Sequence, residues 1–405
     1  MSPRRLFACR AGLVAAAFTL VTHAAVAAPP PLRVGFICPL SGGSGDFGNS
    51  ARLGAELAVK EINEVGGYMG RPLALVARDD QAKPDEGRRA AEDLVLHEKV
   101  DFTVAFCNTG VALKSLEVFQ ANQHVLMVPV ATGSAVTAAY PAADSFVFRL
   151  SPRDTLQADF LVHEVAQRRR LKRVALFADR TAYGEGGLTD LKRFLAEQGL
   201  QPVQVTRFDL GVASLVDEVK AAQAAGAEAI IAYSVGPELA TLASARQAAR
   251  FSGPLLGPWP MSFKTVWDKS GGAAEGAMMV QSIVPDLSNE RRVSFIARLK
   301  RHAGDQPVVS LMAAAQTYDA VHLMLRAVFQ SRGDTRGPAL KAALENLDQP
   351  YPGVVTTHDR PFSMRDHDAF TMNMIWLATW RNGALQFVHA DDAKRAAVIR
   401  RKDGK

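Results

Sequence analysis

Short apolar segments and amphipathic segments alternate along most of this chain, and that order restricts the possible folds more than any other feature. Apolar runs at 32–38, 73–77, 102–106 and 125–128 are separated by stretches in which apolar residues recur at helical spacing. Parallel strands need long crossovers, and a helix is the usual crossover. The pattern therefore predicts a parallel sheet with helices on both faces.

The same alternation starts again after Ser151-Pro152. Strand-like runs at 174–178, 203–206 and 229–233 are separated by helical stripes, which is the pattern of a second unit of the same kind. A chain of 405 residues has room for two to three domains. We therefore expect an α/β protein with two similar lobes, each built on a doubly wound parallel sheet.

The C-terminal part is less regular. It contains helical patterns over 289–303, 310–331 and 337–346, strand-like runs at 277–283, 354–355 and 372–380, and a hairpin over 380–387. The hairpin turn is Asn382-Gly383, a pair that two-residue turns favour. We expect the polar residues 390–405 to form a basic, flexible tail.

The net charge of +6 comes from the two ends of the chain. The first 27 residues carry three arginines and no acid, and residues 391–405 carry six basic residues against three acidic ones. The remainder is close to neutral, so the positive charge does not indicate nucleic-acid binding.

Residues 1–27 have the pattern of a cleaved signal peptide. Arginines precede an apolar stretch over 11–21, and Ala25-Val26-Ala27 provides a cleavage site. An N-terminal anchor helix is the alternative, but the apolar run is short for a span. Cys9 precedes the apolar run, which excludes a lipoprotein anchor. We expect a mature protein in the periplasm.

Two further cysteines, Cys38 and Cys107, end predicted strands. A disulfide could form in an oxidising compartment, but the ends of neighbouring parallel strands seldom suit its geometry. We therefore expect buried free thiols.

The segment Gly43–Gly48 fits the dinucleotide-binding pattern G-x-G-x-x-G between a predicted strand and helix. However, a dinucleotide site also needs an acidic residue about twenty residues after the glycines. The acids that end the second predicted strand, Asp79 and Asp80, lie more than thirty residues after Gly43. We interpret the segment as a flexible loop that delivers Phe47 to a cleft, and we expect no cofactor.

His358-Asp359 and Asp366-His367-Asp368 match no common zinc spacing, so we interpret them as solvated or capping residues and expect no metal. The sequence contains no H-E-x-x-H, G-x-S-x-G or P-loop motif. Nothing in it predicts an enzyme.

Two polar loops, Asn108-Thr109-Gly110 and Ala131-Thr132-Gly133-Ser134, each follow a predicted strand. The ends of parallel strands meet at one sheet edge, where open α/β sheets bind ligands. Hydroxyl and backbone N–H groups there suit an anionic oxygen, and simple helix capping is the alternative. Two such loops at one edge favour a binding site.

Five segments carry a family likeness: Val34–Gly42, Gly54–Asn63, Gly66-Gly67, Pro129–Thr132 and Tyr183–Gly186. Together and in this order they resemble the periplasmic binding proteins for branched-chain amino acids, over nearly all of the mature chain. The resemblance implies the type I two-lobe fold, with three crossover strands near Leu150, Gln281 and Thr356. It then implies a first lobe of 32–149 and 283–355 and a second lobe of 152–281 and 360–389.

In that family a polar side chain after the third strand and an Ala-Thr pair after the fourth hold the ligand carboxylate. An aromatic residue of the first loop and a tyrosine of the second lobe complete the site. The resemblance therefore implies ligand contacts from Phe47, Asn108, Thr109, Val130, Ala131, Thr132, Tyr183 and Trp259.

The chain departs from the family after Gly257-Pro258. An acidic residue normally follows there and receives the ligand ammonium, but this chain has Trp259, and Val235 stands at a second tyrosine position. A buried ammonium without a counter-charge costs roughly several kcal/mol. We therefore expect a small organic carboxylate with an apolar or aromatic body.

An amino acid remains the alternative ligand, with its ammonium on backbone carbonyls or on a relocated acid such as Asp179 or Glu238. The resemblance implies a monomeric solute-binding component of an ABC importer, recognised by an inner-membrane permease after hinge closure. A sensing module for a signalling partner is a second class of function, and an exported enzyme is a third.

Overall fold

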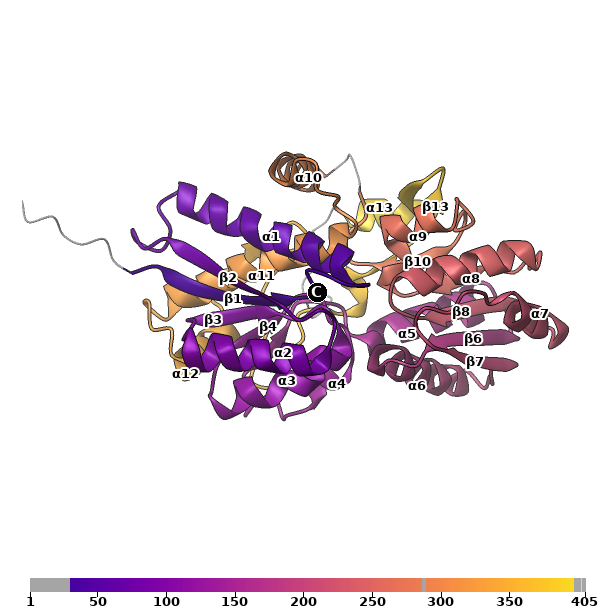
Figure 1. Cartoon of the computed structure of the whole chain (residues 1–405), viewed down its shortest axis with the longest axis horizontal. Helices are drawn as coiled ribbons and strands as arrows, with labels where there is room; N and C mark the ends of the chain where they lie inside the picture. The colour runs from indigo at the N-terminus through magenta and orange to yellow at the C-terminus, as the bar shows by residue number, and fades with distance from the viewer. Residues whose placement is uncertain (1–29, 286–288, 397–401, 403–405) are drawn as a thin grey trace, which may run out of the picture.

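A parallel sheet and a mostly parallel sheet, each with helices on both faces, form two lobes that lie side by side (Figure 1). The computed structural model describes residues 30–285, 289–396 and 402, so the predicted signal peptide lies outside the described residues. The predicted α/β fold with two doubly wound lobes is confirmed. In the described part, no helix combines the length and apolar character needed to cross a membrane.

The sheet of the first lobe has the order β2-β1-β3-β4-β5, and all of its pairings are parallel. Its strands are nearly continuous apolar runs because helices bury both faces. Their bounds are β1 Leu32–Cys38, β2 Leu73–Asp79, β3 Phe102–Ala105, β4 Leu126–Val128 and β5 Val147–Arg149.

Seven helices belong to this lobe in the described residues. One contact is especially close: a Cβ on Gly54 of α1 would lie 2.1 Å from the Ala314 carbonyl oxygen of α11, so only glycine lets these helices approach. The helices are α1 Gly45–Glu64, α2 Pro84–Glu92, α3 Thr109–Ala121, α4 Ala135–Ala138, α10 Glu290–Ala303, α11 Leu311–Gln330 and α12 Gly337–Glu345; a π-helical turn, Asp93–His97, follows α2.

The sheet of the second lobe has the order β14-β13-β10-β9-β8-β6-β7. Among the described residues, β13 pairs antiparallel with both β10 and β14, and the other pairings of this sheet are parallel. The predicted hairpin is confirmed, with Asn382 and Gly383 at φ of 51° and 75° in its turn. The strands are β6 Val174–Asp179, β7 Gln204–Phe208, β8 Ala229–Tyr233, β9 Leu255–Gly257, β10 Met278–Gln281, β13 Trp376–Arg381 and β14 Ala384–Phe387.

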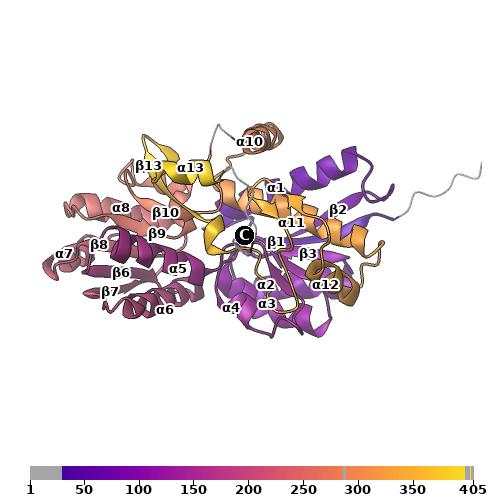
Figure 2. The ribbon, with the colours of Figure 1, turned by 180° about the vertical axis from the view of Figure 1, so that it is seen from behind.

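The helices of the second lobe surround this sheet (Figure 2). Residues 390–396, expected in a flexible tail, instead form a C-terminal helix beside the hairpin, and Asp392 and Ala396 are buried. The helices are α5 Asp154–His163, α6 Ala182–Glu197, α7 Val216–Ala224, α8 Pro237–Ala248, α9 Lys264–Lys269 and α13 Ala390–Ala396, with shorter turns at Glu164–Arg168, Trp259–Ser262 and Met372–Met374.

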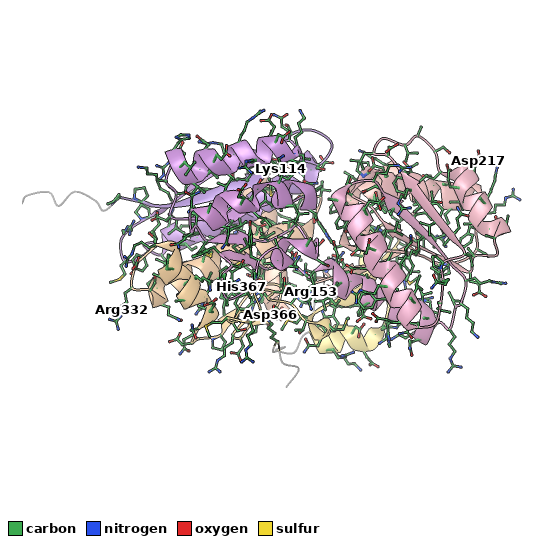
Figure 3. All side chains as sticks on the ribbon, turned by 90° about the horizontal axis from the view of Figure 1, so that it is seen from below. Lys114, Arg153, Asp217, Arg332, Asp366 and His367 are labelled. Carbon is green, nitrogen blue, oxygen red and sulfur yellow. A yellow bond between two sulfur atoms is a disulfide. The ribbon has the colours of Figure 1, made fainter. Side chains whose placement is uncertain are left out.

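The third passage between the lobes lies later than Thr356. His367 stacks on Phe148 of β5 with ring centroids 3.9 Å apart, and its Nδ1 lies 3.0 Å from the Val147 carbonyl oxygen. The chain therefore stays against the first lobe until His367. Figure 3 shows His367 near Arg153 at the junction of the lobes.

The strand expected at Val354-Val355 is absent from these described residues. Both amides instead donate to the buried carboxylate of Asp319, at 2.8 and 3.0 Å. Short strands flank this turn, β11 Tyr351–Pro352 and β12 Thr357–His358. The Asp319 carboxylate thus accepts the two amide hydrogen bonds that a neighbouring strand would otherwise accept.

Cys38 and Cys107 form a disulfide, so the expectation of free thiols is wrong. The pairing of β1 with β3 ends at Ile37 and Ala105, and Cys107 lies beyond that ladder. Phe106 between them has a φ of 76°, which turns the chain out of the strand and brings the two Cα atoms to 5.3 Å. A strand that continued straight would not allow this geometry.

Candidate functional site

A small cavity lies where the ends of the first sheet face the second lobe. The space left between the side chains is about 10 Å³, roughly enough for the centre of one water molecule. The cavity is lined by Phe47, Cys107, Asn108, Thr109, Thr132, Tyr183, Val235, Trp259, Pro260 and Phe263.

The two polar loops of the first lobe meet at this cavity. Asn108 precedes α3, and Thr132 follows β4. The Gly133 amide donates to Thr109 Oγ1 at 3.1 Å, and a Cβ on Gly133 would lie 2.1 Å from Thr109 Cγ2. The absence of a side chain at Gly133 therefore allows the loops to touch and places both sets of polar groups at one sheet edge.

Phe47 comes from the first turn of helix α1, so the expected flexible loop is wrong. A Cβ on Gly48 would lie 1.8 Å from the Pro39 carbonyl oxygen, which explains the glycine without a phosphate ligand. The Asp79 carboxylate accepts hydrogen bonds from the Leu40 amide at 2.8 Å and from Ser41 Oγ at 2.6 Å. The glycine-rich segment thus serves to dock a helix.

Three aromatic rings form one wall of the cavity. The rings of Phe47 and Phe263 stack with centroids 5.1 Å apart, and Trp259 meets both edge-on at 6.0 and 5.1 Å. Such stacked and edge-on arrangements are the favourable ones for aromatic pairs. Phe263 was missed in the sequence, although it follows Trp259 by four residues at the same strand end.

Trp259 joins the two lobes. Its indole Nε1 donates to Thr132 Oγ1 at 3.3 Å. Its backbone is fixed by two buried glutamines: the Trp259 amide donates to Gln157 Oε1 at 3.2 Å, and Gln281 Nε2 donates to the Trp259 carbonyl at 3.1 Å. The indole is therefore held in the gap rather than packed inside the second lobe.

Two polar atoms of the cavity wall are buried without a hydrogen-bond partner, the Tyr183 hydroxyl and Asn108 Oδ1. Burial raises the pKa of Tyr183 well above its usual range, so its hydroxyl stays protonated as a donor. An unsatisfied buried polar group costs about 1–3 kcal/mol, and a native protein rarely leaves one without a reason. Both atoms are available to a ligand.

Asp154 lies behind Thr132 and was missed in the sequence. Its amide donates to the Thr132 carbonyl at 2.8 Å, and the Tyr233 hydroxyl donates to its Oδ1 at 3.0 Å. Complete burial raises the pKa of this carboxyl to about 7. The only sequence signal is an acid just after the first passage between the lobes.

The acids considered as relocated counter-charges do not line the cavity. Asp179 accepts hydrogen bonds from the Thr181 amide at 2.9 Å and from the Val235 amide at 2.8 Å. Glu238 accepts one from the Gly211 amide at 2.8 Å. None of the cavity-lining residues is acidic.

Val130 and Ala131, expected as ligand contacts, are buried but do not line the cavity. The Ala131 amide donates to the Phe106 carbonyl at 3.0 Å, and the Ala131 carbonyl accepts from Ser151 Oγ at 3.0 Å. The Ala131 backbone thus holds the loop that carries Thr132 against Ser151, at the first passage between the lobes.

The expected solvation of the histidine and aspartate clusters is wrong for His358, His367 and Asp368, which are buried. Asp359 and Asp366 are half-buried, and Asp366 caps the turn by accepting a hydrogen bond from the Asp368 amide at 2.9 Å. Asp368 accepts a hydrogen bond from Arg149 Nε at 2.6 Å, and Arg149 also donates to the Thr132 and Gly133 carbonyls at 2.9 and 2.6 Å. This buried ion pair therefore fixes the loop that carries Thr132.

Two parallel-sheet lobes, with polar strand ends facing an aromatic wall across the gap, define a two-lobe binding protein. The chain belongs to the periplasmic binding protein family, whose model matches residues 31–384. It is a solute-binding protein of the ABC transporter type in the branched-chain amino acid group, with extracytoplasmic relatives.

One relative is the Leu/Ile/Val-binding protein homolog 3 of Brucella melitensis, 31% identical over 67% of this chain and 72% of that protein. The fold is similar to that of a type 1 periplasmic binding protein from Bordetella pertussis (TM-score 0.79, 22% identity, 88% and 100% of the two chains). It is also similar to a solute-binding protein of an ABC transporter from R. palustris in complex with benzoate (TM-score 0.74, 21% identity, 88% and 95%).

Proposed function

We propose that this protein captures a small organic carboxylate with an apolar or aromatic body in the cavity between its lobes. It then presents the closed, loaded form to an inner-membrane ABC permease. Export through cleavage of residues 1–27 and action as a monomer are part of the same proposal.

The carboxylate end of the ligand is assigned to the polar strand ends of the first lobe. Three residues of the first lobe line the cavity there: Asn108, Thr109 and Thr132. From the second lobe, the Tyr183 hydroxyl provides a donor that has no partner in the protein. The Asn108 amide can turn its NH₂ group toward a ligand oxygen. Donors buried in a low dielectric bind an anionic oxygen strongly.

The body of the ligand is assigned to the aromatic wall of Phe47, Trp259 and Phe263, with Val235 and Pro260 beside it. These surfaces are apolar, and a ring or branched chain gains from burial against them. The cavity is small, so a ligand must separate the rings or the lobes before it enters.

The observation that carries the proposal is Trp259 at the cavity, with its indole on Thr132. An acid at this place would neutralise an ammonium, whereas an indole offers one N–H donor and a ring face. The donor suits a carboxylate oxygen. This supports an organic acid over an amino acid.

Closure follows from contacts that exist only when the lobes meet. Trp259 and Tyr183 reach the ligand from the second lobe, so a ligand gains these contacts only in the closed form. A ligand shifts a conformational equilibrium only by its differential affinity for the two states. The passages near Leu150, Gln281 and Asp368 are the segments that would bend.

Amino-acid binding is the second candidate, and it is supported by the name of the relative from Brucella melitensis. A thermal-shift screen of amino acids, aromatic acids and aliphatic acids, followed by calorimetry on the hits, separates the two. The proposal predicts stabilisation by monocarboxylates and none by the matching amino acids. The reverse order would refute it.

A sensing role would leave the ligand unchanged but would not need a permease. Reconstitution with a partner permease distinguishes the two roles, because only an importer subunit delivers its ligand for transport across the membrane. Chemical conversion of the bound acid during prolonged incubation would instead indicate an enzyme.

A further inference from the structure

The cavity is walled by pairs of residues that come one from each lobe. At its apolar end, Phe47 of α1 stacks on Phe263, which directly precedes α9, with ring centroids 5.1 Å apart and 25° between the ring planes. At its polar end, Thr132 of the first lobe accepts a hydrogen bond from Trp259 of the second lobe at 3.3 Å. All four residues line this cavity, which we call the interlobe slot. The width of the interlobe slot therefore follows the distance between the lobes.

Trp259 lies beside the stacked pair rather than on an outer face of it. Its ring centroid is 6.0 Å from that of Phe47 and 5.1 Å from that of Phe263, and its plane makes angles of 87° and 73° with theirs. A ring on an outer face would be close to one phenylalanine and far from the other. Both phenylalanines are almost completely buried, at 4% and 2% exposed, so protein covers their outer faces. A ligand ring can therefore stack on both of them only by entering between them.

This arrangement favours a flat ligand. Carbon atoms pack at roughly 3.5–4.0 Å, so a planar ring between two others holds their planes about 7–8 Å apart. A saturated ring is puckered and a branched chain is thicker, so either would hold the lobes further apart. Thr132 and Trp259 would then be too far from each other to bind one carboxylate together. In an aromatic acid the carboxylate lies close to the plane of the ring, so the ligand has one thickness along the whole interlobe slot.

We propose that Phe47 and Phe263 take one flat ring between them, which makes the ligand an aromatic monocarboxylate and Phe263 a residue that determines specificity. The entering ring replaces one stacked pair by two. Its carboxylate reaches Thr132 on one lobe and Trp259 on the other. This inference rests on the proposed function, because it specifies the body of the same carboxylate ligand.

Burial of apolar area alone would not favour an aromatic acid. Cyclohexanecarboxylate has the same carbon skeleton and charge as benzoate and is at least as apolar. Walls that recognise only apolar area would therefore bind it at least as tightly as benzoate. Its puckered ring has no π face, so it would separate Phe47 from Phe263 without forming new stacked pairs. The two acids thus distinguish stacking from simple burial.

The test is calorimetry on the whole mature protein at pH 7, with benzoate and cyclohexanecarboxylate as probes. Carboxylic acids have pKa values of roughly 4, so both probes are ionised at this pH and differ only in the ring. We expect benzoate to bind about 10- to 100-fold more tightly, because it gains two stacked pairs that the saturated acid lacks.

Phe263→Leu keeps an apolar side chain but removes one stacking face. Its affinity for benzoate should fall by about tenfold, while its affinity for cyclohexanecarboxylate should stay within about threefold of the wild type. Phe47→Leu removes the opposite face and should act in the same way. The matched control is Phe251→Leu, at a buried site of the second lobe outside the cavity lining, which should keep the wild-type preference. The comparison of the two acids in the wild type needs no variant, so it tests the inference even if a variant fails to fold.

Each outcome has one meaning. Equal or tighter binding of cyclohexanecarboxylate by the wild type, or a full preference for benzoate in Phe263→Leu, overturns the stacking of a flat ring and leaves the proposed function intact. An equal loss of preference in Phe251→Leu also overturns it, because a general loss of packing in the second lobe would then explain the effect. Absence of binding by any monocarboxylate refutes the proposed function itself.

Discussion

The indole nitrogen of Trp259 lies 3.3 Å from the hydroxyl oxygen of Thr132, and this hydrogen bond joins the second lobe to the first. Thr132 is itself fixed from behind, because Arg149 donates to its carbonyl at 2.9 Å while pairing with Asp368. The proposed binding surface thus consists of a hydrogen-bonded polar loop on one lobe that faces a hydrogen-bonded indole on the other.

Replacement of Thr132 by alanine should weaken carboxylate binding by about 10- to 100-fold, because a hydrogen bond to a charged group is lost. Calorimetry with the tightest monocarboxylate measures the effect. Thr132→Ser keeps the hydroxyl and is the matched control, so it should restore most of the affinity. Equal affinity in the alanine variant and the wild type would remove Thr132 from the site.

Replacement of Trp259 by glutamate should shift preference toward amino acids by about tenfold or more, since a buried carboxylate pairs with an ammonium. Paired titrations with leucine and with isocaproate, which lacks the amino group, give the preference. Trp259→Phe keeps an aromatic wall without a charge and should not gain leucine binding. If the glutamate variant gains no amino-acid affinity, the assignment of the Trp259 position is incorrect.

Much of the fold could be predicted because periodicity reports burial directly. The alternating runs located the strands. Asn382-Gly383 located the hairpin between β13 and β14, because a tight two-residue turn needs positive φ values, which Asn and Gly tolerate. The polar loops at Asn108 and Thr132 were also found, because strand order puts consecutive strand ends at one edge.

The remaining features depend on contacts between distant segments. The disulfide requires the left-handed backbone of Phe106, which no local pattern encodes. Asp154 reaches the cavity region only because the first passage between the lobes begins α5 there. The position of His367 against Phe148 depends on a long irregular segment that sequence periodicity cannot place.

Removal of the Cys38–Cys107 disulfide should lower the free energy of unfolding by about 2–4 kcal/mol, because it closes a long loop in the unfolded chain. Cys107 also lines the cavity beside Asn108, so ligand affinity should fall as well. Urea unfolding of a Cys38→Ser, Cys107→Ser double variant measures the first effect. Reductant should weaken the wild type and leave this variant unchanged; the same sensitivity in both would exclude the disulfide as the cause.

The buried pair of Arg149 and Asp368 should make stability depend on pH in the acid range. The charge of Arg149 lowers the pKa of Asp368 below its usual value, despite burial. A lowered pKa in the folded state means that the pair stabilises the protein above about pH 4 and that this stabilisation is lost as the pH falls further. The wild type should therefore lose more stability than a variant without Asp368 between pH 5 and pH 3.

Asp368→Ala tests this directly. At neutral pH it leaves the guanidinium of Arg149 buried without its partner, and such a loss costs about 3–5 kcal/mol. Because Arg149 also holds the Thr132 and Gly133 carbonyls, ligand affinity should decrease together with stability. Asp217→Ala, at an exposed site of the second lobe, is the control and should change neither quantity. If Asp368→Ala and Asp217→Ala unfold at the same urea concentration at pH 7 and respond equally to acid, then the ion pair does not stabilise the loop that carries Thr132.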